Sequence, residues 1–140
     1  MTRLKLMFVA AAICVASMAE PVIVAARAEK DAKPDPNPKS GFWKKAGVEK
    51  ITRGPKGDPL PMGATEIRTL WTPEYLYVHF SGPFQKMHLK PNPVTDRDTV
   101  PLWDWDVVEV FIGSDFQNIN RYKEYEVSPQ NEWVDLDIRK

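Results

Sequence analysis

Alternating apolar and polar residues predict five β-strands in the second half of the chain. The clearest period-two pattern is Leu76-Tyr77-Val78-His79-Phe80, and the tight connection Thr72-Pro73-Glu74 before it predicts a hairpin with the preceding strand. The predicted strands are residues 65–71, 75–81, 106–112, 121–128 and 133–138. No segment has a convincing helical period, so the pattern indicates an all-β protein, an immunoglobulin-like antiparallel β-sandwich.

The segment 103–112 combines two tryptophans and three carboxylates with a run of β-branched and aromatic residues. Its alternation predicts one face toward a core, formed by Asp106, Val108, Val110 and Ile112. Glu109 is then held in the middle of the opposite face. A carboxylate beside a tryptophan suits a sugar, which offers hydroxyls to the acid and apolar C–H faces to the ring. A merely solvated acid on a strand face is the competing interpretation.

The first residues have the pattern of a secretory signal peptide, which we place at residues 1–28. Arg3 and Lys5 precede an apolar run over residues 6–19, and small-residue cleavage patterns end at Ala19 and at Ala28. The run is shorter than the ~20 apolar residues of a spanning helix. We therefore expect a secreted or periplasmic protein with no membrane attachment after cleavage. The only cysteine, Cys14, lies within the signal.

Residues 29–41 are expected to form a proline-rich linker, because they contain a proline at every second position from Pro34 to Pro38 and no apolar periodicity. The folded domain should begin at Phe42-Trp43, with Trp43 as a core residue. Residues 84–100 are rich in Pro, Asn and Asp and predict a long surface loop. The strand pattern still alternates at the last residues, which suggests the N-terminal part of a larger sandwich.

Composition narrows the function classes. The chain has 140 residues, enough for one domain, with thirteen prolines against seven glycines. Acidic and basic residues balance at 19 each. With no excess positive charge, we expect no nucleic-acid partner.

Two motifs resemble family 9 carbohydrate-binding modules. The first is the hairpin I-R-T-L-W-T-P-E-Y-L-Y-V over residues 67–78, and the second is W-D-W-D-V-V-E-V-F-I over residues 103–112. Phe42-Trp43-Lys44-Lys45-Ala46 also resembles the W-x-x-A that opens many such modules. The resemblance covers residues 42–140, and the second motif is the more specific of the two.

The resemblance implies an antiparallel β-sandwich that binds sugars at the reducing ends of glycan chains, often with structural calcium. It implies that Trp103 is one wall of an aromatic clamp and that Glu109 hydrogen-bonds sugar hydroxyls, with Trp105 nearby. The other wall belongs to a later part of the module, which this chain does not contain. Xylanase-attached members have a sugar-binding arginine where this chain has Glu126, so an acceptor replaces a fork of donors.

Three other constellations compete with this interpretation. A carboxylate pair from Asp106, Glu109, Glu124 and Glu126 is the minimum for a glycoside hydrolase, although the small sandwich provides little room for a catalytic cleft. Haem ligation by His79, Met87 or His88 is a weaker alternative. A calcium site is more credible, because an oxygen-rich loop contains Asn92, Asp96, Asp98, Asp104 and Asp106. Asp104 and Asp106 are its best candidates, although the spacing matches no defined calcium loop.

The sequence thus predicts an exported, non-enzymatic carbohydrate-binding module that acts in polysaccharide breakdown. Its expected sugar-binding residues are Trp103, Trp105, Glu109 and Glu126. Two alternatives stay open at this point. The first is a secreted sandwich of the same fold that has lost sugar binding and acts as an interaction domain, and the second is an accessory part of a glycoside hydrolase.

Overall fold

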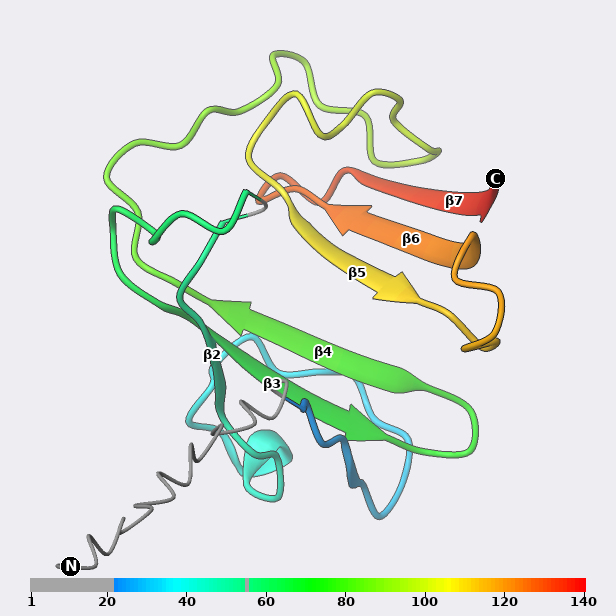
Figure 1. Ribbon diagram of the computed structural model, residues 1–140. Helices are drawn as coiled ribbons and strands as arrows, with labels where there is room; N and C mark the ends of the chain where they lie inside the picture. Colours follow the sequence, from blue (N-terminus) through cyan, green and yellow to red (C-terminus); the bar gives the residue numbers. More distant parts are fainter. Residues whose placement is uncertain (1–21, 55) are drawn as a thin grey trace, which may run out of the picture.

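The computed structural model describes residues 22–54 and 56–140, which form two β-sheets and one short 3₁₀ helix (Figure 1). The all-β, sandwich-type fold expected from the sequence is confirmed. The elements are β1 (Ala26–Arg27), η1 (Gly41–Trp43), β2 (Glu49–Ile51), β3 (Thr65–Trp71), β4 (Leu76–Ser81), β5 (Val108–Ile112), β6 (Arg121–Val127) and β7 (Trp133–Arg139). No helix in these two ranges is long and apolar enough to cross a membrane.

The first sheet is built around β3. Its partner along one edge is β4, antiparallel, with Thr69 opposite Val78. The other edge is shared by two short strands, β2 antiparallel and β1 parallel, so β3 is covered on both sides. The connection between β3 and β4 is held by Thr72, whose hydroxyl accepts the backbone N–H groups of Glu74 and Tyr75 at 3.3 and 3.0 Å. This side-chain turn fixes the hairpin register.

The second sheet has the order β5-β6-β7, with both pairs antiparallel. Asn131 supplies the left-handed residue of the β6–β7 turn (φ 65°), a conformation that asparagine tolerates better than most residues. Strand β5 begins at Val108, two residues later than the sequence predicted. The reason is local, because Asp106 donates its N–H to the His88 carbonyl (2.9 Å) and accepts the His88 N–H on Oδ2 (2.7 Å).

A small core lies on the face of the first sheet that carries Leu70 and Tyr77. Trp43 of η1 is 3 % exposed and packs with these two residues, which confirms it as a core residue. Its indole N–H donates to the Asp35 carbonyl at 2.7 Å, so the ring is buried without leaving its donor unpaired. Phe42 adds edge-to-face contacts with the Trp43 and Tyr77 rings.

The proline-rich segment 29–41 lies against this core, whereas the sequence predicted a linker. It has no strand partner, but its backbone bonds to strand side chains. The Ala32 N–H donates to the Tyr77 hydroxyl (3.3 Å), and His79 Nε2 lies 3.0 Å from the Pro36 carbonyl oxygen. Prolines suit this role because an extended segment with few N–H donors can cross a sheet face without strand pairing.

The expected signal peptide lies mostly outside the described residues, which begin at residue 22. Within the described part, Ala26 and Arg27 form β1 and the Ala28 N–H donates to the Trp71 carbonyl at 2.9 Å. Export and the cleavage site stay predictions.

A buried carboxylate fixes the long segment between β4 and β5. Glu132, fully buried in the β6–β7 turn, accepts the Val94 N–H at 3.1 Å and pairs with Lys90 Nζ at 3.2 Å. Ser128 Oγ lies 3.5 Å from its second oxygen. Burial by itself would raise the pKa of Glu132, but the hydrogen bonds from Val94 and Lys90 outweigh it and hold the pKa below its usual value.

Substitution of Glu132 should therefore loosen this segment. Because Glu132→Ala leaves the Val94 N–H and the Lys90 ammonium without their acceptor, we expect the thermal midpoint to fall by roughly 5–10 °C at neutral pH. Its depressed pKa means that the contribution is present above the unfolded-state pKa and is lost as the pH falls through the lower folded-state pKa. Thermal scans from about pH 3 to pH 7 measure both effects. Exposed Glu74→Ala is the control, and an equal loss in both variants would contradict the assignment.

Candidate functional site

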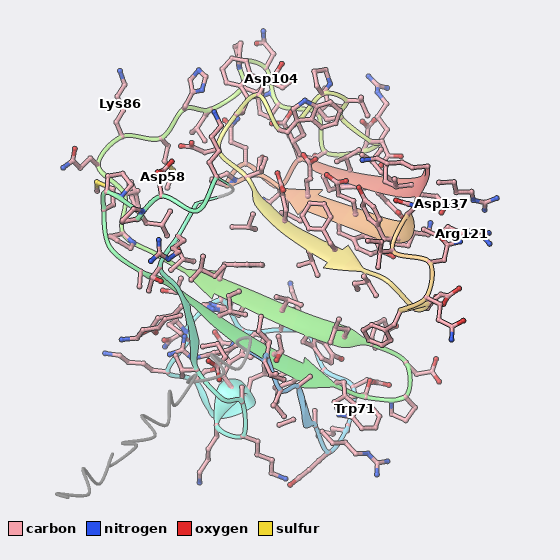
Figure 2. All side chains as sticks on the ribbon, viewed as in Figure 1. Asp58, Trp71, Lys86, Asp104, Arg121 and Asp137 are labelled. Atoms are coloured by element: carbon pink, nitrogen blue, oxygen red, sulfur yellow. The ribbon has the colours of Figure 1, made fainter. Side chains whose placement is uncertain are left out.

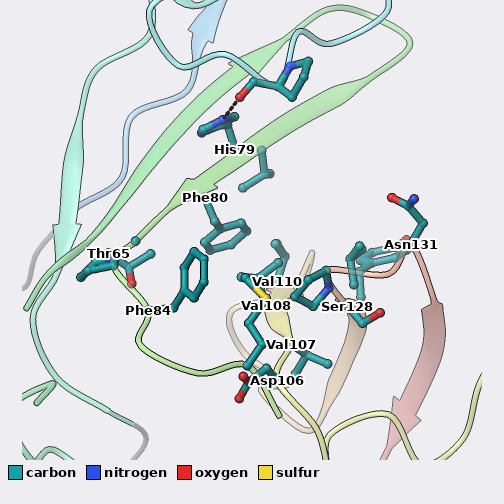
Figure 3. Close-up of a pocket in the computed structure, with 18 of the residues that line it drawn as sticks. Thr65, His79, Phe80, Phe84, Asp106, Val107, Val108, Val110, Ser128 and Asn131 are labelled. Atoms are coloured by element: carbon teal, nitrogen blue, oxygen red, sulfur yellow. Dashed lines mark hydrogen bonds between the residues drawn. The ribbon is translucent and has the colours of Figure 1, made fainter. Parts of the chain in front are cut away.

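The two sheets face an open, mainly apolar cleft of about 1370 Å³. Figure 3 shows Phe80 of β4 and Phe84 on one side of it, with Val108 and Val110 of β5 on the other. Val108 is 37 % and Val127 44 % exposed, which is high for inward-facing strand residues. The predicted inward set on β5 does face the space between the sheets, but this space is not closed by packing.

The opposite face of the second sheet carries three glutamates. Glu109 of β5 lies directly opposite Glu126 of β6, and Glu124 is on the same face because it is two residues from Glu126. Val108 and Val127, the next pair along the ladder, point to the cleft instead. The face that carries the three glutamates, here called the acidic face, also holds Val134 and Leu136 of β7, the ladder partners of Glu126 and Glu124.

Burial differs sharply among the three carboxylates. Glu109 is exposed, Glu124 is half-buried and Glu126 is fully buried. Neither carboxylate oxygen of Glu126 has a hydrogen-bond partner within residues 22–54 and 56–140. Burial and the nearby charges of Glu109 and Glu124 raise the pKa of Glu126 to about 7. Burial and the charge of Glu124 also raise the pKa of Glu109.

Aromatic rings lie beside the acids. Phe111 is directly opposite Glu124, and its ring centroid is 5.7 Å from that of Tyr122. Sequence analysis named Glu124 only as part of a hydrolase pair and did not name Phe111 or Tyr122 as site residues. The period-two alternation of β5 and β6 is the signal that places all of them on the face of Glu109.

The two tryptophans before β5 have different environments. Trp103 is 49 % exposed at a tight turn, which is closed by the Trp105 N–H donating to the Leu102 carbonyl at 3.1 Å and anchored by fully buried Leu102. Trp105 packs on the His88 ring, with centroids 4.4 Å apart. The Trp105 ring therefore packs within the protein, whereas about half of the Trp103 side chain is exposed to solvent and accessible to a ligand.

The predicted calcium ligands do not form a cage. Asp104 lies exposed in the loop before β5 (Figure 2), and one oxygen of Asp106 accepts the His88 N–H. Asp98 likewise accepts the Asp135 N–H at 3.2 Å. Across the part of the chain that the structure describes, no three His, Cys, Asp or Glu side chains are grouped so that they could hold a metal ion. Calcium binding at Asp104 and Asp106 stays a prediction.

The two histidines considered for haem pack against different tryptophans, whereas three of the four candidate hydrolase carboxylates lie together. His79 packs against Trp43 and the Pro36 carbonyl, while His88 packs against Trp105, so each ring already has a protein partner. Of the four carboxylates considered for hydrolysis, Glu109, Glu124 and Glu126 share one face. Asp106 instead lines the cleft and is hydrogen-bonded to His88.

Comparison of the chain with protein-family models, curated proteins and solved structures gave no match. The resemblance to family 9 carbohydrate-binding modules stays a prediction.

The open cleft should be accessible to apolar ligands in solution. The protein should bind a fluorescent apolar dye such as ANS in its native state and should associate with increasing concentration, because apolar strand residues are accessible. Val108→Lys places a charge in the cleft and should reduce dye fluorescence by roughly twofold or more. Phe116→Lys, at a residue 94 % exposed away from the cleft, is the control. Equal dye binding by both variants would show that the cleft is not the dye site.

The raised pKa of Glu126 should make the stability of the protein depend on pH. Its folded-state pKa of about 7 lies above its ordinary value, so wild-type stability should fall as the pH rises between those two values. Glu126→Gln cannot ionise and should be more stable than wild type by on the order of 1–2 kcal/mol at about pH 8. The difference should vanish at about pH 4, where wild-type Glu126 is neutral. Urea unfolding across this range tests it, with exposed Glu49→Gln as control. A pH-independent difference would argue against ionisation as the cause.

Proposed function

We propose that the protein is an exported, non-catalytic carbohydrate-binding module of the family 9 type. In this proposal Trp103 packs on the apolar face of a sugar ring, and Glu109 accepts hydrogen bonds from sugar hydroxyls. Glu126 sets the charge of the same face. The resemblance of residues 67–78 and 103–112 to that family motivates the proposal.

One observation carries it. Glu109, which the resemblance implies for sugar binding, and Glu126, which replaces the family's arginine, lie directly opposite each other on neighbouring strands, on the face away from the apolar cleft. A rigid pair of strands is a suitable platform for a binding site, because it fixes acceptor positions without ordering a loop.

The exposed indole of Trp103 supports the same interpretation. A tryptophan with about half its surface in solvent can offer its ring to a ligand, and large aromatic residues contribute much of the affinity at interfaces. Trp105, engaged with His88, supports the shape of the turn.

The chemistry of the face differs from that of the arginine-bearing relatives. When ionised, Glu109, Glu124 and Glu126 have hydrogen-bond acceptors but no donors. Every hydrogen bond to them from a neutral sugar must therefore come from a sugar hydroxyl proton. Such charge-assisted bonds favour vicinal diols, which present two donors to one carboxylate.

Substitution of the proposed contacts should separate stacking from hydrogen bonding. Trp103→Ala removes the apolar platform and should weaken binding about tenfold to a hundredfold, on the scale of ~1–3 kcal/mol for burying an aromatic side chain. Glu109→Gln keeps the shape but loses the charge, so a loss on the order of 1–2 kcal/mol is expected. Calorimetric titration of the full chain with xylo-, cello- and wider oligosaccharides measures both.

The matched control is Trp133→Ala. Trp133 is 40 % exposed, close to the value for Trp103, but its partner in the ladder is Val127, so it points to the cleft face. Unchanged affinity in Trp133→Ala together with the loss in Trp103→Ala would support the assignment. Wild-type affinity in Trp103→Ala would exclude this residue as a contact. Absence of any glycan binding would favour a sandwich that has lost sugar recognition and serves as an interaction domain.

A further inference from the structure

The three glutamates have no compensating charge among their described neighbours. None of the ion pairs within the described ranges includes Glu109, Glu124 or Glu126. The basic residues of β6 and β7 lie on the other face, since Lys123 is opposite Ile112 and Asp137 in the ladder. Two of them are already paired, Lys123 with Asp135 at 3.5 Å and Arg139 with Asp137 at 2.8 Å. Within the described residues, no ion pair therefore neutralises the acidic face.

Glu126 makes this observation more than a patch of surface acids. Its side chain is fully buried, and both carboxylate oxygens lack a partner in the part of the chain that the structure describes. Buried polar groups in native proteins are nearly always bonded, and an unpaired buried carboxylate is costly. A buried carboxylate without a partner, beside two further acids, is therefore a candidate contact for a ligand of opposite charge.

The three acids lie side by side on one sheet face but differ in exposure. Glu109 is exposed and Glu124 is half-buried, whereas Glu126, directly opposite Glu109 in the ladder, is fully buried. The rings of Phe111 and Tyr122 lie on the same face. Carboxylates bind a cation through charge-assisted bonds, and aromatic faces attract both cations and apolar sugar C–H groups.

From this arrangement, and resting on the proposed function, we propose that the face of Glu109, Glu124 and Glu126 recognises an amino sugar, a glycan unit that carries a protonated primary amine. The ammonium group binds at Glu109 and Glu124, and the charge of Glu126, which is directly opposite Glu109 in the ladder, stabilises it. The sugar ring supplies the apolar surface for the aromatic side chains. A divalent metal ion is a poorer occupant, because no three acidic or histidine side chains are grouped for coordination in the described residues.

The raised pKa of Glu126 fits this occupant. In the free protein, burial and its two acidic neighbours disfavour the ionised form. A bound ammonium group would favour that form again and lower the pKa, so the amine and the carboxylate stabilise each other's charge.

A pair of ligands of equal length tests the proposal. Calorimetric titrations of the full chain compare a tetrasaccharide of glucosamine with one of N-acetylglucosamine, at about pH 6, where such amines are protonated. The acetyl group removes the positive charge and leaves the ring unchanged. We expect the amine form to bind at least about tenfold more tightly, with a preference that decreases as salt is added. In Glu109→Gln and Glu126→Gln the preference should shrink severalfold, while Glu49→Gln on the first sheet keeps it.

The outcomes separate this inference from the proposed function. Equal binding of the two tetrasaccharides, or binding of cello-oligosaccharides alone, would overturn the amino-sugar proposal and leave carbohydrate binding intact. Equal affinity for tetralysine would also overturn it, because the face would then attract any cationic chain. No binding of any glycan would overturn both. Since Glu126→Gln should be at least as stable as wild type at neutral pH, a lost preference in that variant cannot be ascribed to unfolding, and circular dichroism verifies this.

Discussion

The buried carboxylate of Glu132 links the parts of this protein that packing alone leaves apart. The segment between β4 and β5 has no strand of its own, yet it must deliver Trp103 to the start of β5. Glu132 accepts one N–H from this segment and pairs with its Lys90, while Gln130 of the same turn donates to the Lys90 carbonyl at 2.8 Å. By accepting hydrogen bonds from two donors that are distant in sequence, the Glu132 carboxylate fixes the path of a polar segment, as apolar contacts do elsewhere.

Glu126 and Glu132 lie in the same hairpin and are equally buried, but their surroundings differ. Glu132 has a lysine, a backbone N–H and a hydroxyl, and its pKa is lowered. The charges that act on Glu126 are those of Glu109 and Glu124, and its pKa is raised. The surroundings of Glu132 are those that a structural buried charge requires. Glu126 has no such partner in the described part of the chain, and we therefore place the proposed ligand at the acidic face and not at the turn.

Much of the second half could be predicted from the sequence, because period-two alternation has a direct physical cause in the pleat. Strand β3 has the predicted bounds, and Glu109 lies on the face opposite Val108 as expected. Strands β1 and β2 were missed because two or three residues carry no periodicity. The late start of β5 depends on bonds to His88, 18 residues away, and the pairing of Trp105 with the same residue is equally non-local. The burial of Glu126 could not be predicted, since charged residues are seldom buried without a partner.

The register of β5 against β6 determines which side chains face the cleft and which lie on the acidic face. Side chains alternate, so a shift of one residue against β6 would turn Glu109 into the apolar cleft and Val108 onto the acidic face. Two features oppose such a shift. The doubly bonded pair of Asp106 and His88 fixes the strand at its start, and Val108 and Val110 line the cleft with the neighbouring Val127. The cleft-facing residues therefore orient the acidic face, and the position of Glu109 depends on contacts made on the other side of the same sheet.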